Sequence, residues 1–146
     1  MPVQEMTPTQ AWTLLEQGST DGKPSAVLVD VRTQAEWAFV GVPTPRHDMT
    51  ALVTLEWQRF PHMQVNPDFA AILDEQVQSL GGDRTTPLCF LCRSGVRSLH
   101  AAQAMEALGY ETTINIAGGF EGDPNGEGKR GTVNGWKVEG LPWRQA

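Results

Sequence analysis

The apolar run Leu88–Leu91 ends abruptly at Cys92, and this junction constrains the fold more than any other feature of the chain. A short loop with one glycine and two arginines follows, and residues 98–108 have a helical pattern. A buried strand that leads through a loop into a helix is typical of α/β proteins. Backbone N–H groups and the helix dipole attract anions at a helix N-terminus and favour the reactive thiolate. We therefore expect a cysteine nucleophile that acts on a small anion.

Strand and helix patterns alternate along the rest of the chain. The predicted strands share apolar character and cover residues 26–29, 51–57, 88–91 and 112–116. Capping residues and apolar periodicity predict helices over residues 7–18, 33–39, 66–80 and 98–108. This order predicts one α/β domain over residues 1–146, with a mostly parallel central sheet flanked by helices on both faces. Ligands bind beyond the carboxyl ends of the strands in such sheets, where Cys92 falls.

Composition excludes several classes of function. The 146-residue chain has a formal net charge of -6, which argues against nucleic acid or an anionic membrane as a partner. No apolar run approaches the roughly 18 residues of a membrane span. Because we find no secretory signal, we expect a cytoplasmic protein. Two cysteines and three scattered histidines predict neither a disulfide framework nor a metal site, and no cofactor is expected.

Five segments, in this order along the chain, resemble the motifs of the rhodanese (thiosulfate sulfurtransferase) family. They are residues 29–37, 90–98, 108–110, 117–120 and 135–142. The segment Phe90–Ser98 is a fairly specific match to the active-site loop of the family, and the others are weak alone. The resemblance implies a single rhodanese-like domain with insertions near 44–66 and 121–135, which would form a lid or a pocket wall. The turn Gly41–Pro43 lacks the histidine that rhodaneses usually carry there.

The resemblance implies an enzyme that transfers sulfur in two steps. Cys92 would take the outer sulfur of thiosulfate, or of a similar small anionic donor, as a persulfide. The persulfide would then pass its sulfur to cyanide or to a thiol, which in the cell includes the thiol of an acceptor protein. Backbone N–H groups of the loop would stabilise the persulfide anion. The residues of this loop are Arg93, Ser94, Gly95, Val96, Arg97 and Ser98.

Individual roles follow from the same loop. We expect Arg93 to face incoming anions, and Arg97 either to fix the loop or to pair with the departing sulfite. Ser98 either caps the helix or donates a hydrogen bond to the thiolate. Asp30 and Arg32 are expected to orient loops through hydrogen bonds and an ion pair rather than to act in catalysis.

Three other interpretations were weighed. Cys89 gives a Cys-x-x-Cys spacing with Cys92, but an extended chain points the two side chains to opposite faces, so we expect Cys89 to pack in the core. Cysteine phosphatases, and arsenate reductases as the related alternative, place five residues between nucleophile and arginine. Here four residues separate Cys92 from Arg97, which favours a single sulfur as the cargo. A rhodanese-like module that carries or senses sulfur, or docks a partner with little turnover, is the alternative from a different class. His47 and His62 are expected to face solvent.

Overall fold

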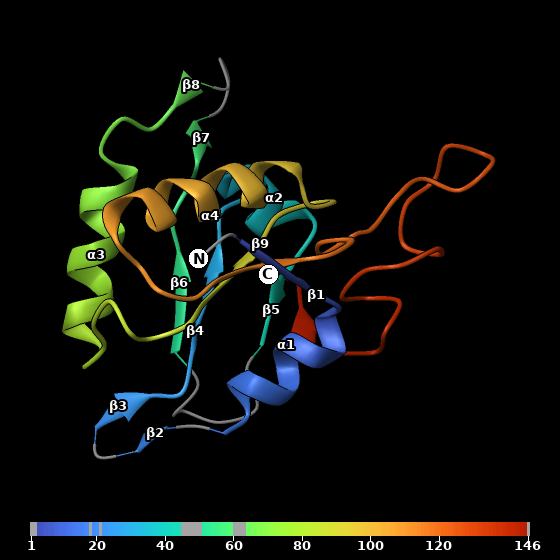
Figure 1. Ribbon diagram of the computed structural model, residues 1–146. Coiled ribbons are helices and arrows are strands. Elements are labelled where there is room, and N and C mark those ends of the chain that lie inside the picture. The colour runs from blue at the N-terminus through green and yellow to red at the C-terminus, as the bar shows by residue number, and fades with distance from the viewer. Residues whose placement is uncertain (1–2, 18, 21, 45–50, 60–63, 146) are drawn as a thin grey trace.

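Five strands form the central sheet of the molecule, a computed structural model that describes residues 3–17, 19–20, 22–44, 51–59 and 64–145. These strands are β1 (Gln4–Met6), β4 (Val27–Asp30), β6 (Ala51–Thr54), β9 (Leu88–Leu91) and β10 (Thr113–Ile116). Their order in the sheet is β1-β10-β9-β4-β6, and each neighbouring pair runs parallel (Figure 1). The mostly parallel sheet predicted from the apolar runs is therefore confirmed.

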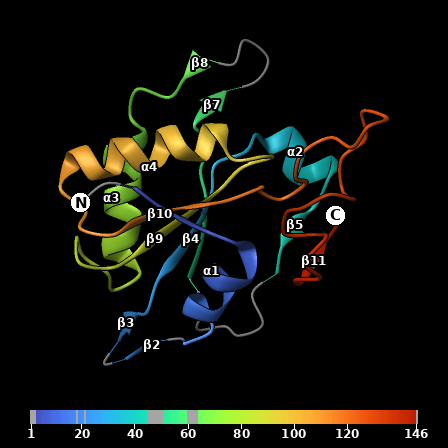
Figure 2. The ribbon, with the colours of Figure 1, turned by 45° about the vertical axis from the view of Figure 1, so that its right-hand side comes forward.

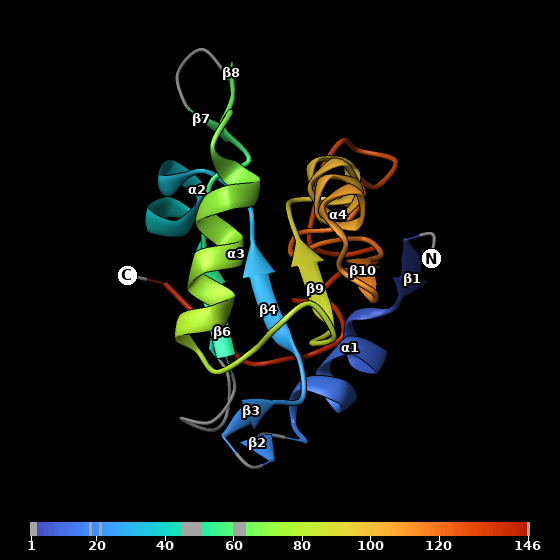
Figure 3. The same ribbon diagram turned by 60° about the vertical axis from the view of Figure 1, so that its left-hand side comes forward.

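Helices cover both faces of the sheet, as predicted. They are α1 (Pro8–Leu15), α2 (Gln34–Phe39), α3 (Phe69–Ser79) and α4 (Val96–Leu108). Figure 1 shows α3 and α1 on opposite sides of the strands, and Figure 3 shows α3 beside β4 with α4 beside β9. Leu88 and Phe90 of β9 pack with α3 and α4, whereas Cys89 and Leu91 pack with α1. The alternation of side chains along β9 thus supplies two cores, one on each face.

Capping boxes begin two of the helices at the predicted places. The Thr7 hydroxyl accepts the Gln10 N–H at α1, and the Thr33 hydroxyl accepts the Glu36 N–H at α2. In each case the side chain three residues on accepts the N–H of the capping threonine. Pro8 at the first position of α1 needs no hydrogen-bond partner there.

Helix α4 begins earlier than the sequence pattern predicts. It starts at Val96 rather than at Ser98, because Gly95 takes a left-handed conformation (φ 117°) that ends the loop at once. Ser98 therefore does not cap the helix. The last three residues of the predicted loop, Val96, Arg97 and Ser98, form the first turn of α4 instead.

The edges of the sheet also differ from prediction. The strand expected over 51–57 ends at Thr54, although Leu55 and Trp57 still donate backbone hydrogen bonds to Asp30 and Val31. Strand β1 was not predicted, because an edge strand of sequence Gln-Glu-Met has no apolar run to mark it.

Three two-stranded antiparallel ribbons complete the fold. They are β2 (Ser19–Thr20) with β3 (Lys23–Pro24), β5 (Val42–Pro43) with β11 (Trp143–Arg144), and β7 (Gln58–Arg59) with β8 (Gln64–Val65). The β5–β11 ribbon lies below α2 at the right of Figure 2. Residues 121–135 form an arm that reaches away from the sheet (Figures 1 and 2). Among the described residues, no helix combines the length and apolar character that a bilayer crossing needs.

Candidate active site

Cys92 follows the last residue of β9, and its side chain lies at the wall of a surface pocket. The residue is 1% exposed, so its sulfur is reached through this pocket of about 330 Å³. The loop after β9, the first turn of α4, helix α2 and strand β7 each contribute to the wall. The lining residues are Glu36, Gln58, Cys92, Arg93, Ser94, Val96 and Arg97.

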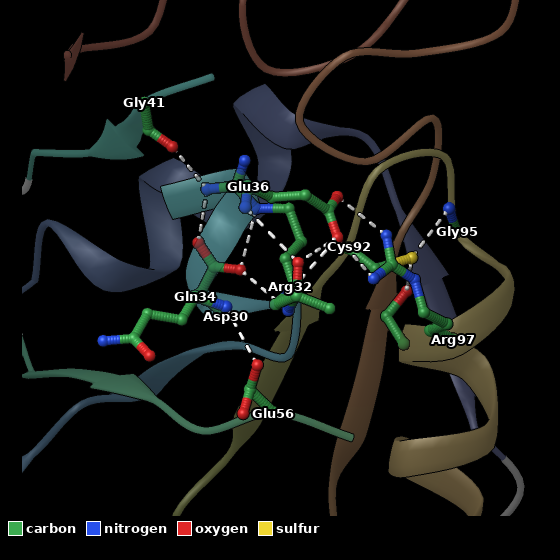
Figure 4. Close-up of polar contacts among 11 residues, drawn as sticks. Asp30, Arg32, Gln34, Glu36, Gly41, Glu56, Cys92, Gly95 and Arg97 are labelled. Atoms are coloured by element: carbon green, nitrogen blue, oxygen red, sulfur yellow. Dashed lines mark hydrogen bonds and ion pairs between the residues drawn. The ribbon is translucent and has the colours of Figure 1, made fainter. Parts of the chain in front are cut away.

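Two polar groups lie beside the Cys92 sulfur. The Gly95 N–H donates to Sγ over 3.1 Å (Figure 4). Ser98 Oγ lies 3.2 Å from the same atom. The N–H groups of Val96, Arg97 and Ser98 have no acceptor within the helix, since they belong to its first turn. Gly95 supplies no side-chain cap for them. The N-terminus of α4 therefore offers hydrogen-bond donors and a positive dipole end beside the sulfur.

Arg97 is held by a carboxylate rather than left free for substrate. Its two terminal nitrogens lie 2.6 and 2.9 Å from the carboxylate oxygens of Glu36 (Figure 4). Partial burial alone would raise the pKa of Glu36, but the Arg97 guanidinium and hydrogen bonds from Thr33 hold that pKa below its ordinary value. Burial opposes the charged form of Arg97, yet Glu36 keeps the pKa of Arg97 above its ordinary value. Of the two roles predicted for Arg97, this geometry favours anchoring.

Arg93 keeps an exposed side chain at the wall of the pocket. The backbone of Arg93 is held by the neighbouring turn, because Arg93 O accepts the N–H groups of Glu121 and Gly122. Cys92 O likewise accepts the Phe120 N–H over 2.7 Å. The turn at residues 119–122 thus supports the loop along its backbone.

Asp30 and Arg32 form a fully buried pair at the carboxyl end of β4. The Arg32 guanidinium donates to both carboxylate oxygens of Asp30, at 2.9 and 2.7 Å, and also to Gly41 O at 2.7 Å (Figure 4). The face of Phe120 lies 4.2 Å from the guanidinium carbon. These contacts tie the segment after α2 to the turn at Phe120.

Cys89 packs in the core on the other face of the sheet, which confirms the sequence prediction. Complete burial raises the pKa of its thiol to about 12. A thiol so strongly protonated, facing away from the pocket, is poorly suited to attack a disulfide or persulfide.

Among the described residues, no group of three or more histidine, cysteine, aspartate or glutamate side chains is placed to hold a metal ion. His47 and His62 lie outside the described residues.

Sequence reasoning missed three residues at the site. Glu36 was recognised as a capping residue, but nothing in its spacing indicated a partner 61 positions away. Asn115 binds Gly95 and Ser98, and a polar residue inside an apolar strand is a sequence signal that could have indicated it. No sequence signal indicated Gln58, because it reaches the pocket from residues 44–66, whose fold the apolar pattern did not predict.

The fold and the site define a class of protein: a parallel α/β protein that presents a cysteine from the end of a central strand to the N-terminus of the next helix. The family model of the Rhodanese-like domain matches residues 7–123, and this chain belongs to that family.

Relatives extend the match over the whole chain. The crystal structure of Rv0390 from M. tuberculosis is 40% identical in sequence, with a TM-score of 0.83 and coverage of 100% of both chains. An uncharacterised protein of Rickettsia conorii is 35% identical over 144 residues, which are 99% of each chain. The thiosulfate sulfurtransferase GlpE of Haemophilus influenzae is 28% identical over 122 residues, or 84% of this chain and 89% of its own. The family therefore includes relatives named as sulfurtransferases.

Proposed function

We propose that this protein is a thiosulfate sulfurtransferase that moves a sulfane sulfur through a persulfide on Cys92. The observation that carries the proposal is the position of Cys92 Sγ, which accepts the Gly95 N–H at the start of α4 and belongs to a residue that lines an open pocket. Such a position stabilises an anionic sulfur and admits a small donor. The name of the relative GlpE supports the same reaction.

In the first half-reaction the Cys92 thiolate attacks the outer sulfur of thiosulfate or of a similar anionic donor. A new S–S bond forms, the S–S bond of the donor breaks, and its electron pair leaves with sulfite. The exposed Arg93 guanidinium at the pocket attracts the donor and the departing sulfite. The outer sulfur of the persulfide carries the negative charge, and the first N–H groups of α4 stabilise it.

In the second half-reaction cyanide, or a thiolate of a small molecule or acceptor protein, attacks the outer sulfur of the persulfide. The S–S bond to Cys92 breaks, and the products are thiocyanate, or a new persulfide, and the Cys92 thiolate. The Gly95 N–H and the Ser98 hydroxyl, 3.1 and 3.2 Å from Sγ, stabilise this thiolate when it leaves and when it attacks. No oxidant or cofactor enters either step.

Phosphate transfer fits the site less well. A phosphatase needs its arginine to bind the equatorial oxygens of the phosphoryl group. Here the terminal nitrogens of Arg97 bind Glu36. The four-residue spacing from Cys92 to Arg97 also favours a single sulfur over a tetrahedral oxyanion.

A sulfur carrier, sensor or protein-docking module is the second candidate. The observation that favours it is Gln58, which brings the β7–β8 ribbon, part of the insertion near 44–66, to the wall of the Cys92 pocket. In that case the persulfide would form but would pass its sulfur to a specific protein thiol, with little turnover of free thiosulfate.

The test is thiocyanate formation from thiosulfate and cyanide by the purified protein. We expect turnover in the wild type and none in Cys92→Ser, with Cys89→Ser retaining activity as the matched control. Undiminished activity in Cys92→Ser would refute the proposal. Slow turnover of thiosulfate, together with fast transfer to a protein thiol, would favour the second candidate.

A further inference from the structure

Asn115 is a buried polar side chain that the two half-reactions do not explain. It lies on β10, is 2% exposed, and points to the α4 side of the sheet, since its neighbours Ile114 and Ile116 pack with α1 on the other side. An amide in the interior is costly unless its donors and acceptor are satisfied. The hydrogen bonds of this amide lead to Gly95 and Ser98 beside the Cys92 sulfur, and to Glu5 of β1.

The amide of Asn115 binds the loop at two points. Nδ2 donates to Gly95 O over 3.0 Å and to Glu5 Oε1 over 3.3 Å, while Oδ1 accepts the Ser98 hydroxyl over 2.5 Å. Carbonyl and carboxylate oxygens only accept hydrogen bonds, so these partners also fix which end of the amide is which. Gly95 and Ser98 are the two residues whose polar groups meet the Cys92 sulfur.

The single hydrogen of the Ser98 hydroxyl makes this arrangement directional. In the thiol form it points at Asn115 Oδ1, and the Cys92 S–H donates to Ser98 Oγ. In the thiolate form, rotation about the Cβ–Oγ bond of Ser98 turns the same hydrogen to the sulfur without moving the oxygen. The Asn115 amide therefore places Ser98 Oγ beside the sulfur while Cys92 is a thiol. When the Ser98 hydrogen turns to the thiolate, Nδ2 still holds Gly95 O.

We propose that Asn115 is a positioning residue for sulfur transfer: its Nδ2 holds Gly95 O, so that the Gly95 N–H points at Cys92 Sγ, and its Oδ1 accepts the Ser98 hydroxyl and so fixes Ser98 Oγ beside the same sulfur. The chemistry of this proposal rests on the proposed function. Its geometry rests on the hydrogen bonds that join Cys92, Gly95, Ser98 and Asn115. Asn115 does not line the pocket, so it acts through the loop and not on the substrate. Glu5 is the outer anchor of the amide and holds it more weakly.

The first test separates binding from chemistry in Asn115→Ala. We expect kcat for thiocyanate formation to fall about tenfold to a hundredfold, while KM for thiosulfate changes little, because the donors at Sγ act on the reacting atom. Thr113→Val is the matched control. It lies two positions earlier on β10, is equally buried, and its hydroxyl has no hydrogen-bond partner among the described residues. Wild-type kcat in Asn115→Ala would overturn the proposal, as would an equal loss in Thr113→Val.

The second test is a double-mutant cycle. If Asn115 acts through Ser98, then Asn115→Ala combined with Ser98→Ala lowers kcat by clearly less than the product of the two single effects. Thr113→Val combined with Ser98→Ala should be multiplicative. Multiplicative effects for Asn115 and Ser98 would contradict the proposal.

Asn115→Asp tests the donor end of the amide separately from its acceptor end. It keeps the shape of the side chain and an acceptor for Ser98, but it turns an oxygen towards Gly95 O. We expect the same loss in kcat, and wild-type kcat in this variant would contradict the clamp.

A third measurement does not depend on sulfur transfer. Iodoacetamide alkylation of Cys92 at neutral pH reports the reactivity of the thiol, with Cys92→Ser as the blank. Asn115→Ala should be alkylated several-fold more slowly than wild type, and Thr113→Val at the wild-type rate. A rate in Asn115→Ala equal to or above that of Thr113→Val overturns the inference. If the wild type forms no thiocyanate, the proposed function fails, and alkylation still decides the role of Asn115.

Discussion

Glu36 and Arg97 join the first turn of α2 to the first turn of α4 through two hydrogen bonds of 2.6 and 2.9 Å. The same carboxylate closes the capping box of α2 by accepting the Thr33 N–H and hydroxyl. One side chain thus sets the start of a helix and also holds the cation at the pocket wall. The positions of α2 and of the active-site loop are coupled through this pair.

Replacing Glu36 by Gln should lower the free energy of unfolding by about 2 kcal/mol at neutral pH, between the values typical of exposed and of buried ion pairs. Because folding lowers the pKa of Glu36 from 4.5, the carboxylate stabilises the native state above that pH. This contribution is lost as pH falls through the lowered pKa of the native state. Urea unfolding over a pH series should therefore show the wild type and Glu36→Gln converging in acid.

The control for this series is Glu75→Gln, which removes an exposed carboxylate from α3. It should stay close to the wild type at every pH. A stability gap between wild type and Glu36→Gln that is unchanged from neutral pH to acid would show that the pair does not act through the charge of Glu36.

Arg93→Ala should weaken donor binding more than it slows the chemistry. The Arg93 guanidinium is the exposed cation at the pocket, whereas the charge of Arg97 is balanced by Glu36. Loss of one charge-assisted contact should raise KM for thiosulfate about tenfold, with a smaller change in kcat and in stability. Lys129→Ala removes the same charge from the exposed arm and should leave KM unchanged. Equal KM changes in the two variants would mean that net charge, not Arg93, attracts the donor.

Cys89→Ala should leave sulfur transfer intact and cost about 1 kcal/mol of stability, since it removes a buried sulfur from the core beside α1. Steady-state thiocyanate formation and thermal unfolding check the two parts separately. Loss of turnover in a folded Cys89→Ala protein would revive the redox interpretation of the Cys-x-x-Cys spacing.

Gly119→Ala should destabilise the protein by about 3 kcal/mol or more. Gly119 has φ 63°, and a Cβ there would lie 2.6 Å from Arg93 O and closer still to Cys92 O. The added methyl would push against the backbone of the active-site loop, so turnover should also fall. Gly126→Ala on the arm meets nothing within 4 Å and is the matched control in both assays. Equal stability of the two variants would contradict the close packing of the loop on this turn.

Much of this molecule was predictable from local pattern. The strand Leu88–Leu91, the N-cap Thr7, the capping box at Thr33 and the core position of Cys89 all follow from local residue spacing, and each is found. The loop between Cys92 and α4 was located correctly, although its end was placed too late, because the left-handed turn at Gly95 leaves little trace in apolar periodicity.

Side-chain partners that lie far apart in the sequence could not be predicted from it. Glu36, the partner of Arg97, lies 61 positions away in the sequence. Asn115 has two such partners, Gly95 at 20 positions and Glu5 at 110 positions. Such contacts depend on which strands become neighbours in the sheet, and a single sequence carries no direct record of that choice. Asn115 is the instructive case, since a polar residue in a doubly covered strand demands a partner even when the partner cannot be named.

The most direct test of the persulfide account is the intact mass of the protein after treatment with thiosulfate. The account predicts the addition of one sulfur atom to the wild type, its removal by cyanide, and no addition to Cys92→Ser. An unchanged mass in the wild type, or an added sulfur that persists in Cys92→Ser, would contradict it.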